Sequence, residues 1–338
     1  MLNKDTISIH LVREALLHSS DSRDATHEVL SAVGINPAML DDPEGRVPAV
    51  AYARMWRLLA RRLDDEFFGM DPRKLRAGSL AFMCRCAMAQ PTLAQGLEVV
   101  LGFLSLMLER LPAHVVRQQS LAEIVLHEPD AAPNRAFTYF TYWMIVHGVA
   151  CWLVGRRIPI MAIELRCAAP DYGEDYAVMF SENLRFDRPR TRMIVAANCL
   201  DAPIKRTEQE LQRFLAQAPA NILVKYRDRQ SLASQIKHTL RTLPAAQWPE
   251  TNGVANTLCM SASTLRRRLA DEGQTYQGLK DGVRKELAIA WLAEPDLSFA
   301  AIAHLLGFAD TSSFYKAFRK WFGSNPGHYR SLILGVSA

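Results

Sequence analysis

Arginine side chains stand in a run beside apolar residues in the last third of this 338-residue chain. Arg266, Arg267 and Arg268 lie between Leu265 and Leu269. Residues four apart share one face of a helix, so the two leucines would face a packing partner and the arginines would face solvent. The guanidinium group donates in a fork that matches phosphate oxygens and the acceptor edge of guanine. The chemistry indicated here is recognition of a nucleic acid.

The same pattern recurs further along the chain. Residues 254–269 are repeated as residues 302–318 with an offset of 48, which becomes 49 after a one-residue insertion. Phe314 and Phe318 replace the two leucines, and the outward positions are Tyr315, Lys316, Arg319 and Lys320. Each copy predicts a short helix, a tight turn and a second helix, the helix-turn-helix pattern. Two such units could place their second helices in adjacent major grooves about 34 Å apart. A pair of ordinary helical hairpins is the alternative.

The basic excess of the chain is confined to this region. Residues 225–338 carry 15 Lys and Arg against 9 Asp and Glu, whereas the first 224 residues carry 25 against 26. A basic segment attached to a near-neutral one indicates a polyanionic partner for that segment alone. Charge by itself does not separate this interpretation from a solvated basic face.

A longer ordered set of residues carries a resemblance. It comprises residues 260–269, 302–308 and 313–323, followed by Pro326, Tyr329 and Arg330. Together, over residues 258–330, they resemble the DNA-binding domain of the AraC/XylS family of bacterial transcription regulators. The amino-terminal part is more loosely similar to the large ligand-binding-type domain of the OruR and VirS branch. That likeness rests on residues 46–48, 163–170 and 184–187.

The resemblance implies which side chains touch DNA. Base contacts fall to Ser263, Arg266 and Arg267 on the first recognition helix, and to Thr311, Ser312, Ser313, Tyr315 and Lys316 on the second. Phosphate contacts suit Arg268, Arg319 and Lys320, and the helix starts expected at Ser263 and Thr311. Ser263 and Lys316 stand where many relatives have arginine, and lysine keeps the charge but loses the fork. Which arginine of 266–268 reads a base stays open.

No set of residues supports catalysis, a metal site or a cofactor site. Cys84-x-Cys86 has no second Cys/His pair at zinc spacing. Ser234-x-x-Lys237 resembles a hydrolase nucleophile motif, but the Lys-Thr-Gly that accompanies it is missing. Neither a Gly-x-x-x-x-Gly-Lys nor a Gly-x-Gly-x-x-Gly loop occurs. We therefore expect a protein that is not an enzyme and needs no cofactor.

Hydrophobic periodicity predicts an α+β amino-terminal domain followed by an all-α domain with two helix-turn-helix units and a long linker helix. The first domain should span residues 1–217, the linker 218–229 and the DNA-binding domain 230–338, with its units at about 252–271 and 298–322. In the first domain we expect helices at 50–63, 92–111, 135–154 and 208–217, and strands at 120–126, 162–167 and 192–196. In the second we expect helices at 231–243, 252–259, 263–271, 276–293, 299–306 and 311–322. Its core should contain Thr264, Leu265, Leu269, Trp291, Phe308, Phe314, Phe318 and Trp321.

The resemblance implies that the first domain senses a small molecule and mediates self-association. Its aromatic helix, 135–154, either lines a pocket or forms a plain core. The amphipathic helix 208–217 either pairs with a copy of itself or packs on its own domain. Tyr329 and Arg330 are expected to pin the carboxyl-terminal end of the chain.

A cytoplasmic location is expected. No signal sequence opens the chain, and its longest apolar runs, 99–108 and 143–154, fall short of the ~20 residues that cross a membrane. Its six unevenly spaced cysteines suit free thiols. The function expected is a sequence-specific transcription regulator, an activator that contacts promoter DNA and RNA polymerase. The alternative is a small-molecule-binding protein with non-specific, architectural DNA binding. The ratio of specific to random-DNA affinity separates them, since specific readers typically reach ~10³ or more.

Overall fold

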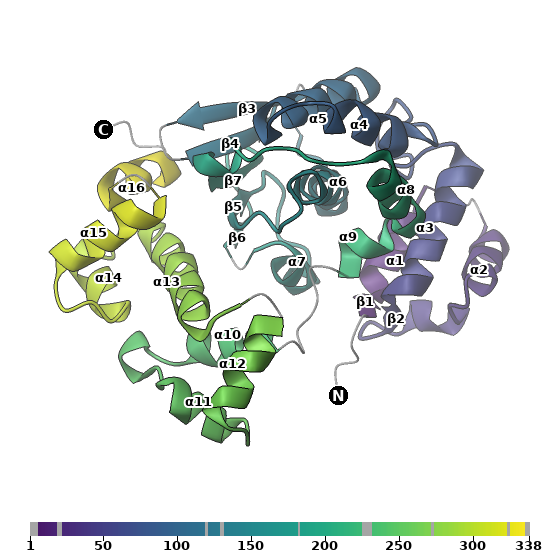
Figure 1. The fold of residues 1–338 in the computed structure, drawn as a ribbon. Helices are drawn as coiled ribbons and strands as arrows, with labels where there is room; N and C mark the ends of the chain where they lie inside the picture. Colours follow the sequence, from purple (N-terminus) through teal and green to yellow (C-terminus); the bar gives the residue numbers. More distant parts are fainter. Residues whose placement is uncertain are drawn as a thin grey trace. The chain divides into compact units, whose positions relative to one another are not determined.

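The computed structural model describes residues 6–18, 22–118, 121–128, 132–181, 183–224, 232–271, 274–322 and 325–334. The chain forms two compact units, Met1–Arg227 and Asp228–Ala338 (Figure 1). The first combines sheets with helices, and every described element of the second is a helix. The predicted fold class, α+β followed by all-α, is therefore confirmed.

The first unit is built around a five-stranded sheet in the order β3-β4-β7-β5-β6. Its strands are β3 (Ala113–Gln118), β4 (Leu121–Leu126), β7 (Arg192–Ala196), β5 (Ile160–Glu164) and β6 (Leu184–Arg185). Neighbouring strands are antiparallel except β5 and β6, which are parallel. The predicted strand 192–196 has the bounds of β7, and β5 begins two residues before the predicted 162–167. The sequence did not predict β3, because this edge strand is half-exposed and shows no clean alternation.

Charged side chains are buried between three strands of this sheet. The Arg192 guanidinium donates from Nε to Glu164 Oε2 at 2.6 Å and from Nη1 to Glu123 Oε2 at 2.9 Å. Burial alone would lower the pKa of Arg192, but the hydrogen bonds and charges of Glu164 and Glu123 raise it. Glu123 lies on β4 and Glu164 on β5, so these contacts join β7 to both of its neighbours. Removing one partner would leave a buried charge unpaired, which is costly.

Helices surround the sheet and extend away from it in the first unit. They are α1 (Ile9–Leu16), α2 (Arg23–Ala32), α3 (Ala49–Leu63), α4 (Ser79–Met88), α5 (Leu93–Met107), α6 (Ala136–Val154), α7 (Gly173–Met179), α8 (Glu208–Gln217) and α9 (Ala220–Val224). A two-stranded ribbon of β1 (Thr6–Ser8) and β2 (Arg46–Pro48) joins two distant parts of the chain. Helix α5 ends at Met107, four residues before the predicted end.

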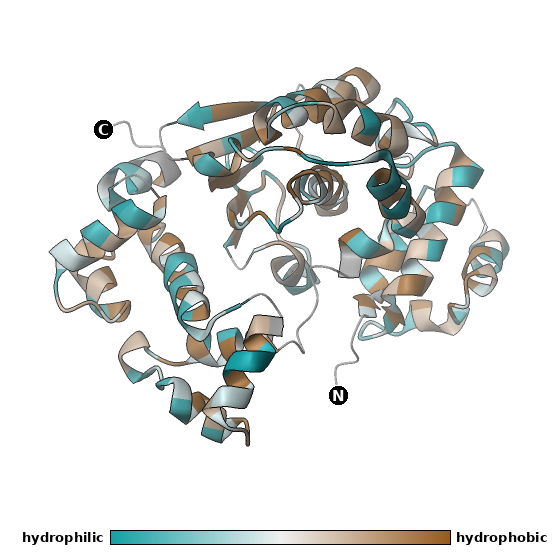
Figure 2. Ribbon diagram, viewed as in Figure 1, coloured by the Kyte–Doolittle hydropathy of each residue, from teal (hydrophilic) through white to brown (hydrophobic). Residues whose placement is uncertain are grey.

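The helix α6 is the core of the first unit. It is apolar around its whole circumference (Figure 2), and a helix of that kind belongs in a protein interior or a membrane. By length and composition it could cross a membrane, but 89% of its most apolar window is buried inside the protein. The predicted helix, 135–154, agrees with α6 to within one residue, and the apolar run 143–154 is its second half; Thr138, Thr141 and their aromatic neighbours belong to the same buried helix. Its aromatic side chains form a core, and Met144 and Ile145 of the same helix also line a pocket, so each of the two interpretations describes part of α6.

The helix α8 packs on its own unit. Thr207 and Glu210 form a capping box at its start, so the helix begins where the sequence predicts. Leu211 and Phe214 are buried, and Phe214 stacks on Trp152 of α6 with ring centroids 4.8 Å apart. The face considered for pairing with a second copy is therefore used inside the unit.

The first unit continues past residue 217. Helix α9 lies in the segment predicted as linker, and its Ile222 belongs to the first unit's core. The remaining linker residues, 225–229, lie outside the described residues, as does the expected capping residue Ser231.

The second unit consists of helices close to the predicted ones. They are α10 (Leu232–Thr242), α11 (Thr251–Thr257), α12 (Ala262–Asp271), α13 (Tyr276–Leu292), α14 (Phe299–Leu305), α15 (Thr311–Phe322) and α16 (Pro326–Leu334). Ser298 caps α14 as expected, with its Oγ accepting from the Ala301 N–H at 3.1 Å. The sequence did not predict α16, which lies beyond the repeated pattern.

Candidate nucleic-acid interface

The two helix-turn-helix units share one backbone conformation at the turn. Cys259 (φ 52°) and Gly307 (φ 75°), 48 residues apart, both adopt the left-handed conformation after a short helix. The next N–H then reaches back five residues in each copy, from Met260 to the Ala255 carbonyl and from Phe308 to the Ala303 carbonyl, both at 2.9 Å. This is a Schellman-type helix ending. The repeat read from the sequence is therefore a repeat in the backbone.

Each second helix starts with a side-chain cap. The Ser261 Oγ accepts from the Thr264 N–H at 3.1 Å, and Asp310 Oδ1 accepts from the Ser313 N–H at 2.7 Å. The first recognition helix thus begins at Ala262 with Ser261 as cap, one residue before the predicted start. The second begins at Thr311 as predicted.

Four side chains pin the recognition helices to the second unit. Leu265 and Leu269 of α12 are buried, as are Phe314 and Phe318 of α15, which confirms the inward face of the pattern. The other four expected core residues are only half-buried: Thr264, Trp291, Phe308 and Trp321. Three of them are large and apolar, and Thr264 precedes the buried Leu265, which suggested a core; each is half-buried because it lies where the small unit meets solvent.

All four predicted contact residues on α12 are exposed. Arg266, Arg267 and Arg268 follow one another on the outer surface, and no ion pair engages them within the described part of the chain. Ser263 is also exposed, with its hydroxyl 2.9 Å from that of the capping Ser261. Helix α12 therefore presents unneutralised donors to any partner.

The predicted contact residues on α15 divide into two groups. Ser312, Lys316, Arg319 and Lys320 are exposed, whereas Thr311, Ser313 and Tyr315 are half-buried. The Ser313 hydroxyl donates to Asp310 Oδ2 at 2.9 Å, so it serves the cap. Tyr315 packs edge-on against Phe299 of α14, with ring centroids 5.8 Å apart. These two side chains are held by the protein and are less free to reach a base.

The start of α15 carries a fixed negative charge. Hydrogen bonds from the Ser313 backbone and side chain lower the pKa of the Asp310 carboxyl. The carboxylate complements the positive end of the helix dipole. It also disfavours a phosphate there, so the two recognition helices differ at their starts.

Arg284 of α13 connects the two helix-turn-helix units, both within residues 228–338, and the sequence did not reveal this contact. Its guanidinium lies 5.0 Å from the Trp248 ring centroid and 6.0 Å from that of Phe308, and its Nε donates to the Leu306 carbonyl at 3.3 Å. Trp248 belongs to the hydrophobic core that holds the first helix-turn-helix, whereas Phe308 follows the turn of the second helix-turn-helix. Nothing in the spacing of Arg284 distinguishes it from the other cations of α13.

Arg330 pins the carboxyl-terminal part of the chain, as expected. It donates to the Leu292 carbonyl at 3.2 Å and to the Leu297 carbonyl at 2.6 Å, and it stacks on Phe299. Tyr329 is fully buried beside it. Both residues therefore act within the protein.

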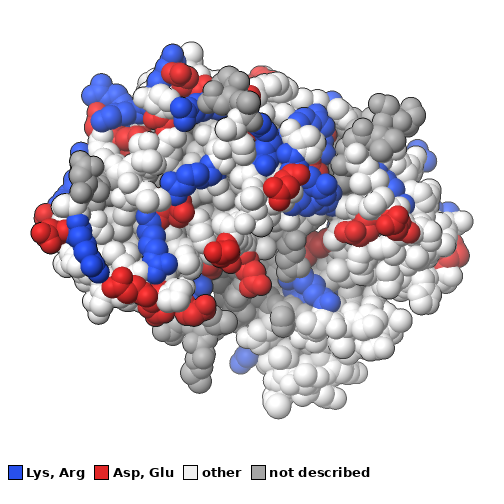
Figure 3. All heavy atoms as spheres, turned by 180° about the vertical axis from the view of Figure 1, so that it is seen from behind, with Lys and Arg blue, Asp and Glu red and all other residues white. Residues whose placement is uncertain are grey.

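Acidic and basic side chains mix over the face drawn in Figure 3, so no band of one sign covers it.

Cys84 is buried, and burial raises the pKa of its thiol to about 12, which is the opposite of what a metal ligand or nucleophile needs. Among the described residues, no group of three His, Cys, Asp or Glu side chains could hold a metal ion. The side chain of Ser234 lies outside the described residues.

Comparison with known proteins accounts for both parts of the chain. Residues 25–204 match the arabinose-binding N-terminal domain of AraC transcription regulators, and residues 254–331 match a helix-turn-helix domain. The ornithine utilization regulator of Pseudomonas aeruginosa is 24% identical over 322 residues, 94% of each chain. VirS of Mycobacterium tuberculosis is 25% identical over 308 residues, 88% of each chain. The crystal structure of CdpR from Pseudomonas aeruginosa, 20% identical, covers 92% of this chain and 99% of that one with a TM-score of 0.29.

A paired helix-turn-helix unit together with this amino-terminal domain defines a DNA-binding transcription regulator. The chain belongs to the AraC family.

Proposed function

We propose that the chain reads two adjacent major-groove segments of promoter DNA, one with α12 and one with α15. The observation that carries this proposal is the duplicated turn, which leaves a cationic helix face outward in both copies while Leu265, Leu269, Phe314 and Phe318 hold the other face. A helix placed in this way fits the major groove, where each base pair presents a distinct donor and acceptor pattern.

The contacts divide by position on each helix. We assign base reading to Ser263, Arg266 and Arg267 on α12 and to Ser312 and Lys316 on α15, with Thr311 at its first turn. Arg268, Arg319 and Lys320 suit phosphates, which fix the register of a protein on the duplex. Ser313 and Tyr315, implied by the resemblance as base readers, instead position the helix through Asp310 and Phe299.

The amino-terminal unit supplies control in this proposal. The family it matches is described as ligand-binding, which supports a small-molecule effector for this chain. We further propose a cytoplasmic regulator that acts as an activator through RNA polymerase and associates as a homodimer. The relatives are transcription regulators, and we propose no catalytic step.

Binding-site selection tests the proposal. The full chain is incubated with a random duplex library, the bound pool is sequenced, and the best site is measured against random DNA at two salt concentrations. We expect a motif of two blocks about one helical turn apart and a specific affinity ~10³-fold or more above random. A featureless pool with steep salt dependence would mean phosphate binding alone, the architectural alternative.

A further inference from the structure

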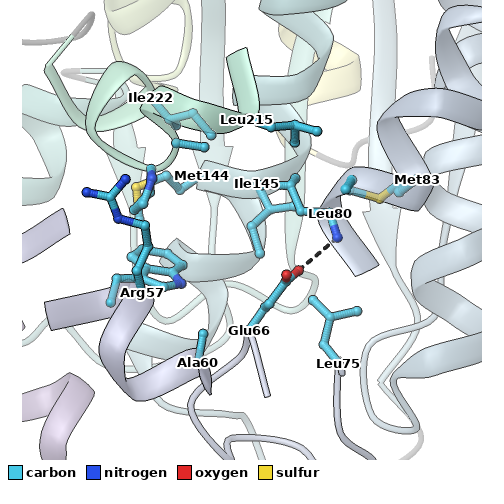
Figure 4. A pocket seen from close by; sticks show the side chains of 14 residues that line it. Arg57, Ala60, Glu66, Leu75, Leu80, Met83, Met144, Ile145, Leu215 and Ile222 are labelled. Carbon is cyan, nitrogen blue, oxygen red and sulfur yellow. Dashed lines mark hydrogen bonds between the residues drawn. The ribbon is translucent and has the colours of Figure 1, made fainter. Parts of the chain in front are cut away.

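A pocket lies between helices of the first unit (Figure 4), and its lining includes no residue of the five-stranded sheet. Helices α3, α4, α6, α8 and α9 and the segment between α3 and α4 contribute its walls, and its volume is about 230 Å³. Its apolar wall includes Ala60, Leu75, Met83, Ile145 and Ile222, each less than a tenth exposed. No motif in the sequence indicated this pocket, because its lining comes from five helices and the segment between α3 and α4.

The size of the pocket restricts its occupant. A dry cavity of ~150 Å³ lined by apolar side chains holds benzene. The present pocket is about half as large again, so it has room for a fused two-ring molecule of about ten heavy atoms.

The lining favours an aromatic ring over an aliphatic chain. Trp56 of α3 offers a ring for stacking or edge contact, and the thioethers of Met83 and Met144 also line the pocket. Sulfur atoms at the edge of an aromatic ring and offset ring pairs each stabilise more than area burial alone. Arg57, whose Nη1 donates to the Ala216 carbonyl at 3.2 Å, adds a guanidinium that can interact with a ring face.

One carboxyl group gives the pocket a polar point. Glu66 extends among Leu75, Leu80 and Ile145 (Figure 4), and its Oε1 and Oε2 accept from the N–H groups of Gly78 and Leu80 at 2.7 and 2.8 Å. Each carboxylate oxygen has room for a second donor. The group therefore accepts one hydrogen bond from an occupant and disfavours an anionic one.

A sugar does not suit this lining. A pentose carries four hydroxyl groups, and every one that is buried without a partner costs free energy. Glu66 and Arg57 are the charged side chains among the residues that line the pocket, and both already bond to the backbone. The arabinose of the family's description is therefore not the expected occupant.

The pocket is also connected to the end of the first unit. Leu215 of α8, Pro219 and Ile222 of α9 close one side of it, and α9 is the last described element before α10 begins at Leu232. Ile222 lies so close to α6 that a Cβ on Gly148 would come within 2.7 Å of its Cγ2. An occupant of the pocket would therefore contact α9 on one side, while α6 holds α9 in place on the other side.

We propose that this pocket binds an uncharged, two-ring aromatic molecule that donates one hydrogen bond to Glu66, and that its occupancy changes DNA affinity through α9. The regulatory half rests on the function proposed above. The binding half does not, because it concerns the first unit alone.

Calorimetry on the full chain tests the binding half. The probes are indole, its isostere benzofuran, which lacks the N–H, and L-arabinose. We expect indole to bind, benzofuran to bind roughly tenfold more weakly through the lost hydrogen bond, and L-arabinose to give no heat. Ala81→Leu fills the pocket and should weaken indole binding at least tenfold, whereas Ala89→Leu, exposed at the end of the same helix, should not. Equal binding of indole and benzofuran, or undiminished binding to Ala81→Leu, would overturn this assignment.

The regulatory half is tested on the selected duplex. Indole should change the affinity of the full chain for that duplex at least threefold, and the change should disappear in Ala81→Leu. If indole binds and the duplex affinity stays the same, the coupling through α9 is wrong. If the chain selects no duplex at all, the proposed function fails, while the calorimetric result still decides the pocket.

Discussion

Asp310 and Ser313 are joined by two hydrogen bonds at the start of α15, one from the serine N–H at 2.7 Å and one from its hydroxyl at 2.9 Å. The pair closes the first turn of the second recognition helix. At the same place in the first copy the cap is Ser261, a neutral side chain. The two copies therefore share a backbone and differ in charge where they would approach DNA.

Replacing Asp310 by alanine should lower the melting temperature of the full chain by a few degrees, because the helix loses its cap and a favourable charge at its dipole. The hydrogen bonds lower the pKa of Asp310 in the folded state, so its contribution is present above the usual carboxyl pKa and is lost as the pH falls through the lowered value. The difference between wild type and variant should then shrink below about pH 4. Asp296→Ala, an equal charge change at an exposed loop position, is the control. Equal melting of wild type and Asp310→Ala at pH 7 would contradict the assignment.

Cys259→Gly should stabilise the second unit by up to about 1 kcal/mol. A side chain in the left-handed conformation is strained, and glycine adopts that conformation freely. Gly307→Ala should destabilise, because φ is 75° there and the added Cβ would lie 3.3 Å from that of Ala245. Denaturant unfolding of the full chain measures both. Cys259→Ser keeps the backbone strain and removes the thiol, so a gain from serine equal to that from glycine would refute the explanation.

Arg267→Ala and Lys316→Ala should each relax specificity at one confined base-pair position, by ~1–3 kcal/mol for a good contact. Arg319→Ala should instead weaken binding to all sequences and reduce its salt dependence. Titration of the selected duplex and single-position variants of it separates the two outcomes. Should all three changes lower affinity uniformly, the assignment of base readers is wrong.

His147 should make the first unit less stable in mild acid. The ring is buried in α6 and bonds to the Ile158 carbonyl at 2.8 Å, and burial lowers its pKa to about 4. Because the unfolded ring takes up a proton near pH 6.5 and the folded ring resists it, stability is full above pH 6.5 and falls toward pH 4, by up to about 3 kcal/mol. His147→Gln keeps a donor and does not titrate, so its unfolding free energy should vary less between pH 7 and 4.5. His18→Gln, at an exposed site, should retain the wild-type slope.

Much of the fold follows from local sequence patterns. The helices α8, α13 and α15 were predicted within a residue because caps, proline and apolar spacing mark them. The edge strand β3 was not, since half of its surface meets solvent and its pattern is weak. The helix α6 was predicted to within one residue, but its apolar spacing could not show that Thr138 and Thr141, polar by type, are buried by the packing around them.

The sequence predicted which faces of α12 and α15 are exposed, but it did not predict which side chains on those faces are held by other residues. Periodicity separates the inward Leu265 and Phe314 from the outward arginines. It does not show that Ser313 is held by Asp310, that Tyr315 rests on Phe299, or that Arg284 contacts both helix-turn-helix units, because these contacts join different turns or helices. The pocket around Glu66 could not be predicted from the sequence for the same reason, because its lining residues come from several helices.

The Arg284 contacts fix the spacing between the two recognition helices, so the protein sets this spacing before it meets DNA. With Trp248 from the core of the first helix-turn-helix on one side and Phe308 after the turn of the second on the other, this guanidinium links the two helix-turn-helix units through α13. DNA completes a turn in about 10–10.5 base pairs, so one extra base pair between two blocks rotates the second by roughly 35° about the duplex axis. With the two recognition helices held at a fixed spacing, binding would depend on the rotation between the two blocks about the duplex axis as well as on their bases. A promoter with the right bases at the wrong helical phase would then bind weakly.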